Sequence, residues 1–145
     1  MKANEKQVGG THYKKSKFQP WDWDRYGVGY LECNVIKYVT RYRDKGGKED
    51  LEKAIHYVDK LIEEAHNYGR SNRVGYPWYD MDQLVSKYTD EWSLDEHQTA
   101  VVMLMVYWTQ TKALDVAKEH IQSLIDGHST SDVQSSEQLE GKVSE

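Results

Sequence analysis

Apolar residues recur along the chain at helical spacing, and no segment alternates apolar and polar residues as a strand does. The clearest helix is predicted over about residues 49–67, where acidic residues occupy the first turn and a glycine lies just past the end. A second helix is predicted over about residues 31–44. The short Lys-Gly-Gly-Lys turn between them predicts an antiparallel helical hairpin. The apolar face of the helix over residues 49–67 consists of Leu51, Ala54, Ile55, Val58, Leu61, Ile62 and Ala65.

Three further helices are predicted over about residues 81–92, 93–110 and 112–126, so the predicted fold class is all-α. The segment Ser93-Leu94-Asp95-Glu96 has the sequence of a capping box that opens the second of them. Residues 100–108 are nine apolar residues in succession, which predicts burial on all sides, either inside the monomer or against a second copy. Because only 38% of the residues are hydrophobic, we expect a homo-oligomer assembled through these C-terminal helices.

The two ends of the chain differ in composition from its middle. Residues 1–10 are polar and end in two glycines, which predicts a flexible lead. Residues 128–145 are rich in Ser, Gln and Glu and have few large apolar residues, which predicts a disordered tail. Residues 11–127 are therefore expected to form a single helical domain, as the length of 145 residues suggests.

Composition narrows the partners and the chemistry. With 19 basic and 24 acidic residues the net charge is −5, which argues against nucleic acid or an anionic membrane as partner but leaves room for a local phosphate pocket. The single cysteine, Cys33, excludes an internal disulfide and is expected to be a buried structural thiol. No apolar run is long enough to span a membrane, so a cytoplasmic protein is expected. No metal site is predicted, because no metal-ligand spacing relates His12, His66, His97, His120 and His128.

A polar stripe with three cations and one amide lies beside the apolar face of the helix over residues 31–44, and Tyr38 marks the boundary. Arginine offers bidentate contacts to phosphate and lysine offers point charges, so the stripe suits a phosphate group; the alternative is a solvated basic face. If the guanidinium of Arg41 lies in a groove between helices, it is available to a ligand, and replacing Arg41 with alanine should scarcely affect folding. Backbone N–H groups of the Lys-Gly-Gly-Lys turn offer a second anion cradle. The stripe consists of Asn34, Lys37, Arg41 and Lys45.

The facing helix has an acidic stripe that suggests Mg²⁺ binding, as in all-α pyrophosphohydrolases. It lies opposite the apolar face centred on Val58, however, which favours a solvated surface. Lys53 and Tyr57 lie on the flank of that helix, and this position is better suited to contact with a ligand than that of the acidic stripe. The aromatic segments at 21–23 and 76–79 could stack a nucleobase or pack in the core. The acidic stripe consists of Glu49, Glu52, His56, Asp59 and Glu63.

An ordered set of motifs over residues 12–64 resembles a known family. The motifs are Thr11-His12-Tyr13, Asn34-x-x-Lys37-Tyr38-x-x-Arg41, Lys45-Gly46 and Asp50-Leu51-x-Lys53-Ala54-x-x-Tyr57. They are similar to those of small phage-encoded, nucleotide-kinase-like proteins, relatives of a coliphage deoxynucleoside monophosphate kinase that lacks a P-loop. This chain has no G-x-x-x-x-G-K-[ST] loop either. The resemblance implies a shared surface formed by His12, Tyr13, Asn34, Lys37, Arg41, Lys45 and Lys53. Together with Tyr57, on the flank of its helix, these residues are the predicted nucleotide site.

The resemblance implies an enzyme of the host cytoplasm that transfers phosphate from a nucleoside triphosphate, with Mg²⁺, to a nucleoside or deoxynucleoside monophosphate. A non-catalytic protein that sequesters a host nucleotide or immune signal would need the same cations and rings. A helical interaction protein with merely solvated stripes is the third alternative. The segment after Gly69 lies outside the resemblance.

Overall fold

The computed structural model describes residues 18–68 and 80–144, and within these ranges all regular secondary structure is helical, which confirms the predicted all-α class. Within residues 18–68 and 80–144, a 3-10 helix comes first and is followed by five α-helices. None of the helices in the described ranges is long and apolar enough to cross a membrane. The elements are η3 (Pro20–Tyr26), α1 (Tyr30–Arg41), α2 (Gly47–Tyr68), α3 (Met81–Glu91), α4 (Glu96–Tyr107) and α5 (Thr111–Ser144).

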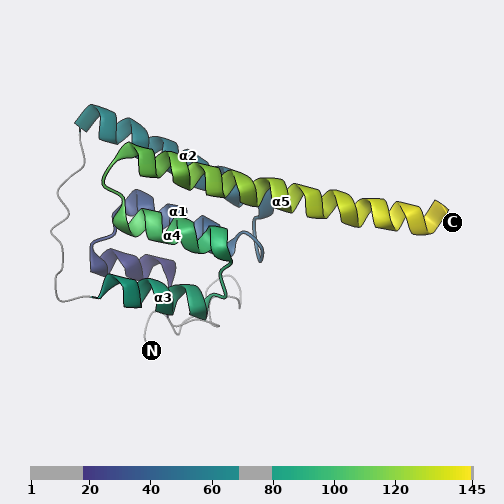
Figure 1. Cartoon of the computed structure of the whole chain (residues 1–145), viewed down its shortest axis with the longest axis horizontal. Coiled ribbons are helices and arrows are strands. Elements are labelled where there is room, and N and C mark those ends of the chain that lie inside the picture. The colour runs from purple at the N-terminus through teal and green to yellow at the C-terminus, as the bar shows by residue number, and fades with distance from the viewer. Residues whose placement is uncertain (1–17, 69–79, 145) are drawn as a thin grey trace.

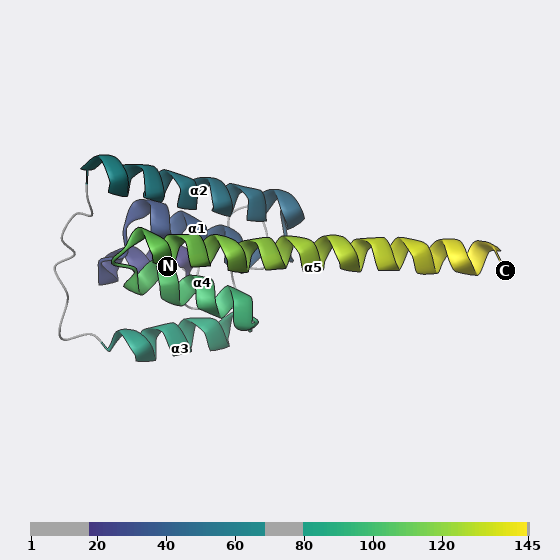
Figure 2. The ribbon, with the colours of Figure 1, turned by 45° about the horizontal axis from the view of Figure 1, so that its top comes forward.

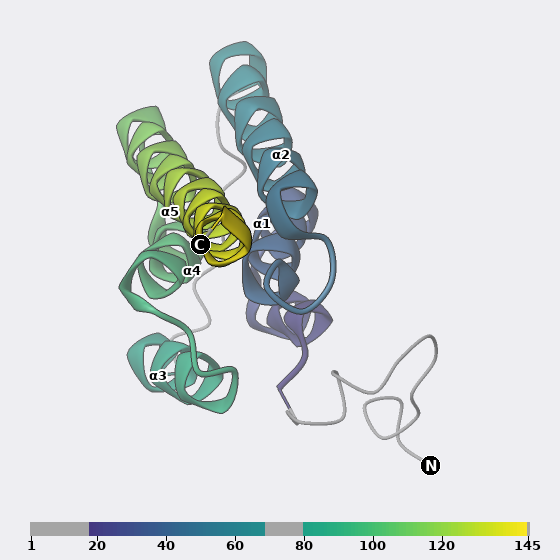
Figure 3. The same cartoon turned by 90° about the vertical axis from the view of Figure 1, so that its right-hand side faces the viewer.

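The helices form two layers of three, seen end-on in Figure 3. Helices α2, α1 and η3 make one layer, and α5, α4 and α3 make the other, so that α2 packs on α5 and α1 packs on α4. Apolar side chains from both layers fill the space between them, which removes this surface from water and stabilises the fold. Among the fully buried residues are Val35, Ile36, Val39, Leu51, Val58, Val101, Val102, Met105, Leu114 and Ile121.

An aromatic cluster joins η3 to α3. The rings of Phe18 and Trp23 lie 5.0 and 5.4 Å from the ring of Tyr88, between centroids, and both contacts are edge-on. The indole Nε1 of Trp92 donates a hydrogen bond to the carbonyl of Phe18 at 2.7 Å. Of the two tryptophans in segment 21–23, Trp23 is therefore a core residue, whereas Trp21 is 61% exposed.

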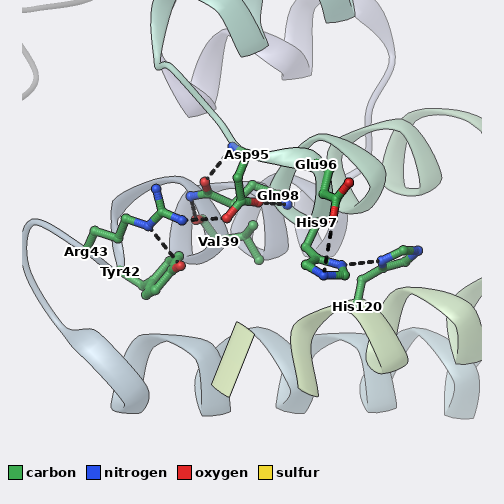
Figure 4. Close-up of polar contacts among 8 residues, drawn as sticks. All are labelled: Val39, Tyr42, Arg43, Asp95, Glu96, His97, Gln98 and His120. Atoms are coloured by element: carbon green, nitrogen blue, oxygen red, sulfur yellow. Dashed lines mark hydrogen bonds and ion pairs between the residues drawn. The ribbon is translucent and has the colours of Figure 1, made fainter. Parts of the chain in front are cut away.

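Helix α4 begins two residues later than its sequence suggests. The cap is Asp95, whose carboxylate accepts from the backbone N–H of Gln98 at 2.8 Å, while the Gln98 side chain accepts from the Asp95 N–H at 2.9 Å. The predicted cap, Ser93, is wrong, because Ser93 has a φ of 52° and belongs to the preceding turn. Gln98 also donates to the carbonyl of Val39 at 2.8 Å and so links α4 to α1 (Figure 4).

The apolar run in α4 is buried mostly by this chain itself. Val101, Val102 and Met105 are fully buried, because α1, α3 and α5 pack against three sides of the helix. The fourth side leaves Met103 44% exposed and Tyr107 41% exposed. The monomer alone therefore does not bury this helix around its whole circumference, which was one of the two alternatives. Association of copies stays a prediction, limited to the side with these two residues.

Helix α5 continues to Ser144, where the sequence predicts a disordered tail from His128. Its C-terminal half projects beyond the other helices (Figures 1 and 2). The physical reason is that the packed first half supplies the costly nucleus, and a segment without proline, rich in Gln, Glu and Ser, then propagates the helix. His128 packs edge-on against Tyr42, at 6.0 Å between ring centroids. The predicted lead at residues 1–10 and the aromatic segment 76–79 lie outside the described residues.

Candidate anion-binding site on helices α1 and α2

A buried ion pair closes the turn between α1 and α2. The guanidinium of Arg41 donates from Nε and Nη2 to the two carboxylate oxygens of Asp50, at 3.1 and 3.3 Å. The Asp50 side chain is 3% exposed and that of Arg41 is 17% exposed. The guanidinium therefore holds the hairpin together and is not simply available to a ligand. The condition for a negligible effect on folding, a guanidinium of Arg41 that lies free in a groove, is therefore not met.

The two glycines of the turn, Gly46 and Gly47, also help to join α1 to α2. The Gly46 N–H donates to Asp50 Oδ2 at 3.0 Å, and the Gly47 N–H donates to the carbonyl of Tyr42 at 2.7 Å. A Cβ on Gly46 would lie 2.2 Å from the Asp50 carboxyl group, so only glycine lets this side chain fold back onto the turn. Gly47 has a φ of +53°, which also favours glycine. Because both N–H groups are already used, they do not form the predicted anion cradle.

Three cationic groups surround the ring of Tyr38. The Nζ of Lys37 lies 4.5 Å from the ring centroid, the Cζ of Arg41 lies 4.8 Å away, and the Nζ of Lys53 lies 5.6 Å away. Lys37 and Arg41 come from α1, and Lys53 comes from α2. Cations near a ring face are attracted by its quadrupole, although they repel one another. The fold therefore brings together three of the predicted site residues around one aromatic ring.

These cations differ in how far their charge is neutralised. Arg41 is paired with Asp50, and Lys53 lies 3.5 Å from the carboxylate of Glu49, in a pair whose glutamate is 76% exposed. An exposed pair of this kind contributes little and exchanges readily with other anions. For Lys37, no ion pair is found among the residues that the structure describes. Lys37 is thus the cation best placed to meet an incoming anion.

Two further tyrosines extend this surface. Tyr57 of α2 stacks on Tyr38, with 5.8 Å between ring centroids and 23° between ring planes. Tyr30, at the start of α1, is 73% exposed. Burial and the neighbouring phenols of Tyr38 and Tyr30 raise the pKa of Tyr57, and the ammonium of Lys53 opposes this shift. The phenol of Tyr57, which is neutral at physiological pH in any case, therefore ionises only at a more alkaline pH than an ordinary tyrosine.

The other predicted site residues are placed differently. The side-chain amide of Asn34 donates to the carbonyl of Tyr30 on its own helix, at 2.9 Å. Lys45 is exposed in the turn after α1, and its backbone N–H donates to the Arg41 carbonyl at 3.1 Å. His12 and Tyr13 lie outside the described residues. Cys33 is only partly buried, and its thiol lies 3.5 Å from the carbonyl of Val28.

The acidic stripe of α2 is a solvated surface, as the sequence favours. All five of its residues are exposed, and its carboxylates pair with lysines. One of these pairs crosses to α5, where Lys118 lies 2.6 Å from Asp59. No group of three or more His, Cys, Asp or Glu side chains is arranged to hold a metal ion within the described ranges.

Two features of this site escaped the sequence reasoning. Tyr38, which is the centre of the cationic cluster, was noted as a boundary residue of the stripe and as part of a motif, but it was not predicted as a site residue. Asp50, the partner of Arg41, was likewise noted in a motif and in an acidic first turn, with no role at the site. A signal for Asp50 was present, since an acidic residue four positions after the first glycine of a Gly-Gly turn can reach back to the turn's backbone N–H.

Over residues 8–59, just over a third of its length, the chain matches a family of proteins of unknown function, DUF3310. This segment includes η3, α1 and the first half of α2, and so contains the described residues of the candidate site. No curated protein and no solved structure matches the chain.

Proposed function

We propose that the surface around Tyr38 binds a nucleotide through its phosphate groups. The observation behind this proposal is the convergence of Lys37, Arg41 and Lys53 on one ring, with Lys37 lacking a described carboxylate partner. In a chain of net charge −5, a local cluster of cations attracts small anions selectively. Lysine ammonium groups act as point charges for phosphate oxygens.

The aromatic residues beside the cations favour a nucleotide over inorganic phosphate. Tyr57 stacks on Tyr38, the ring that Lys37 lies over, and Tyr30 exposes its ring at the start of the same helix. Nucleobases stack on such rings with a gain of about 1–3 kcal/mol each. A ligand with a flat base and a charged phosphate would use both parts of this surface. Asn34, one helical turn from Tyr30, is positioned to contact the ligand between these parts.

Phosphoryl transfer from a nucleoside triphosphate to a nucleoside or deoxynucleoside monophosphate is the activity that we propose for this site. Its support is the resemblance of residues 12–64 to nucleotide-kinase-like phage proteins. Such a transfer requires mainly positioning and charge neutralisation, which cations of the protein and an Mg²⁺ ion bound with the triphosphate would supply. Binding without transfer, which would sequester a host nucleotide or signal, uses the same contacts and is the second candidate.

Calorimetric titration with ATP and with a panel of deoxynucleoside monophosphates tests binding. Lys37→Ala should weaken the affinity roughly tenfold or more, because a hydrogen bond to a charged group contributes about 1.5–3 kcal/mol. Lys60→Ala is the matched control, since Lys60 is an exposed lysine of α2 that pairs with Glu63 and is not one of the cations around Tyr38. Equal affinity in the Lys37 variant and the wild type, or no binding of any nucleotide, would overturn the proposal.

Incubation with ATP, Mg²⁺ and each monophosphate, followed by chromatography of the nucleotides, separates the two candidates. Formation of diphosphates that is lost in the Lys37 variant supports the kinase. Binding without diphosphate formation supports sequestration.

A further inference from the structure

Two histidines that are 23 residues apart in the sequence meet between α4 and α5. The Nδ1 atoms of His97 and His120 lie 2.9 Å apart, and their ring centroids lie 5.2 Å apart (Figure 4). At this distance one imidazole donates a hydrogen to the other, so one of the two nitrogens presents a lone pair. The His97 side chain is 35% exposed, so the pair can be reached from solvent.

We propose that His97 and His120 bind a divalent transition-metal ion that prefers imidazole ligands, such as Zn²⁺. Two nitrogens bound to one tetrahedral Zn²⁺, each about 2.0–2.1 Å from the ion, lie about 3.3 Å from each other. Starting from 2.9 Å, the Nδ1 atoms need to separate by about 0.4 Å, and both rings need to rotate so that their lone pairs converge on the ion instead of sharing one hydrogen. The helices already hold the two ligands together, so little ordering remains to be done when the ion binds.

Glu96 is the carboxylate near the outer nitrogen of this pair. Its Oε1 lies 3.9 Å from Nε2 of His97, the ring nitrogen on the side away from His120 (Figure 4), which is too far for a hydrogen bond, and its side chain is 89% exposed. When Nδ1 of a neutral histidine binds a metal, the ring hydrogen resides on Nε2, and a carboxylate there orients the ring and raises its basicity. Whichever of the two imidazoles holds its hydrogen on Nδ1 would hold it on Nε2 once the ion is bound, with no net release of a proton; in His97 that nitrogen faces Glu96.

The coordination shell is open on the solvent side. In the part of the chain that the structure describes, no third His, Cys, Asp or Glu joins the pair. Water molecules therefore complete the shell, so the bound ion exchanges with ions in solution. While bound, the ion links α4 to α5 and strengthens their contact. The sequence alone indicated no metal site, because the two ligands lie on different helices and have no motif spacing.

Calorimetric titration of the untagged full chain with ZnCl₂, after chelator treatment, tests the proposal. The wild type should bind one ion per chain at this pair, and its thermal midpoint should rise with the Zn²⁺ concentration. His97→Gln and His120→Gln should each weaken the binding at least tenfold, and Glu96→Gln should weaken it by a smaller factor. The control is His56→Gln, an exposed histidine of α2, which should keep the wild-type affinity.

A measurement on the wild type alone avoids any dependence on how the variants fold. Nitrogen-15 NMR of the histidine rings should show that Zn²⁺ shifts the Nδ1 resonances of His97 and His120 together. Absence of saturable binding, equal affinity in the His97 and His120 variants and the wild type, or a shift confined to other histidines would each overturn the proposal.

Discussion

Replacing Arg41 with alanine should destabilise the protein as well as affect its ligand site. Asp50 accepts two hydrogen bonds from the guanidinium and one from the Gly46 N–H. Without Arg41 the carboxylate stays in the turn with its backbone contact but without a counter-charge. A buried charge that has lost its partner is costly, because the desolvation is no longer offset by attraction.

The magnitude follows from the burial of the two side chains. Removing one partner of a fully buried ion pair costs about 3–5 kcal/mol. Here Asp50 is 3% exposed but Arg41 is 17% exposed, so water enters the space that the guanidinium leaves. We therefore expect a loss of about 2–3 kcal/mol, below the fully buried case. For a chain of this size that corresponds to a fall of roughly 6–9 °C in the thermal midpoint.

Urea unfolding followed by circular dichroism measures this loss, and a double-mutant cycle with Asp50→Asn assigns it to the pair. The expected coupling energy is about 1.5–3 kcal/mol. Lys37→Ala is the control on the same helix and should change the stability by less than about 0.5 kcal/mol, since Lys37 has no described ion pair. An Arg41 variant that is as stable as the wild type, or a coupling energy near zero, would refute the reasoning.

Three further outcomes are expected. Burial and a hydrogen bond to Asp82 raise the pKa of Tyr107 from 10.0 to about 12, so the stability from its neutral phenol is present below pH 10 and lost as the pH rises to about 12. The urea midpoint should thus fall less between these pH values in Tyr107→Phe than in the wild type. Truncation after His128 should leave the thermal midpoint nearly unchanged, whereas truncation after Gly127 should cost about 0.5 kcal/mol by removing the contact with Tyr42. If copies associate through the outward side of α4, light scattering should show dissociation in Met103→Glu; a wild type that is already monomeric would exclude this.

Helices were predictable from this sequence where burial repeats at a fixed spacing. The five predicted helices correspond to α1 through α5, because the period of the apolar residues reflects one buried face per helix. Their ends were less predictable, since Ser93 and Asp95 are both good caps and only the fold decides which one is used. The short helix η3 was missed because seven residues offer no period to read, although Pro20 and Asp22 are typical of a helix start.

The candidate site was predictable as a set of residues on one side of a helix, but its chemistry was not. Helical spacing placed Lys37 and Arg41 together, and the structure confirms that both lie near Tyr38. Arg41 rather than Lys37 forms an ion pair because Asp50 lies across the turn from Arg41. Helical spacing does not predict the course of the backbone through that turn. The same limit applies to His97 and His120, whose contact depends on the packing of α4 against α5.

The segment that matches the DUF3310 family packs its buried groups against the rest of this chain. Polar groups of α1 find partners on later helices: the Glu32 carboxylate accepts from Trp108 Nε1 at 3.0 Å, and the Thr40 hydroxyl lies 2.7 Å from the Tyr88 hydroxyl. The buried faces of α1 and α2 are likewise covered by α4 and α5. A fragment of residues 1–69 should therefore lack a cooperative thermal transition, since a helical hairpin without tertiary packing is marginal in water. The chain truncated after His128 is the control and should keep its transition. Cooperative unfolding of the fragment would mean that the α1–α2 hairpin, with its Arg41–Asp50 pair, is sufficient to fold.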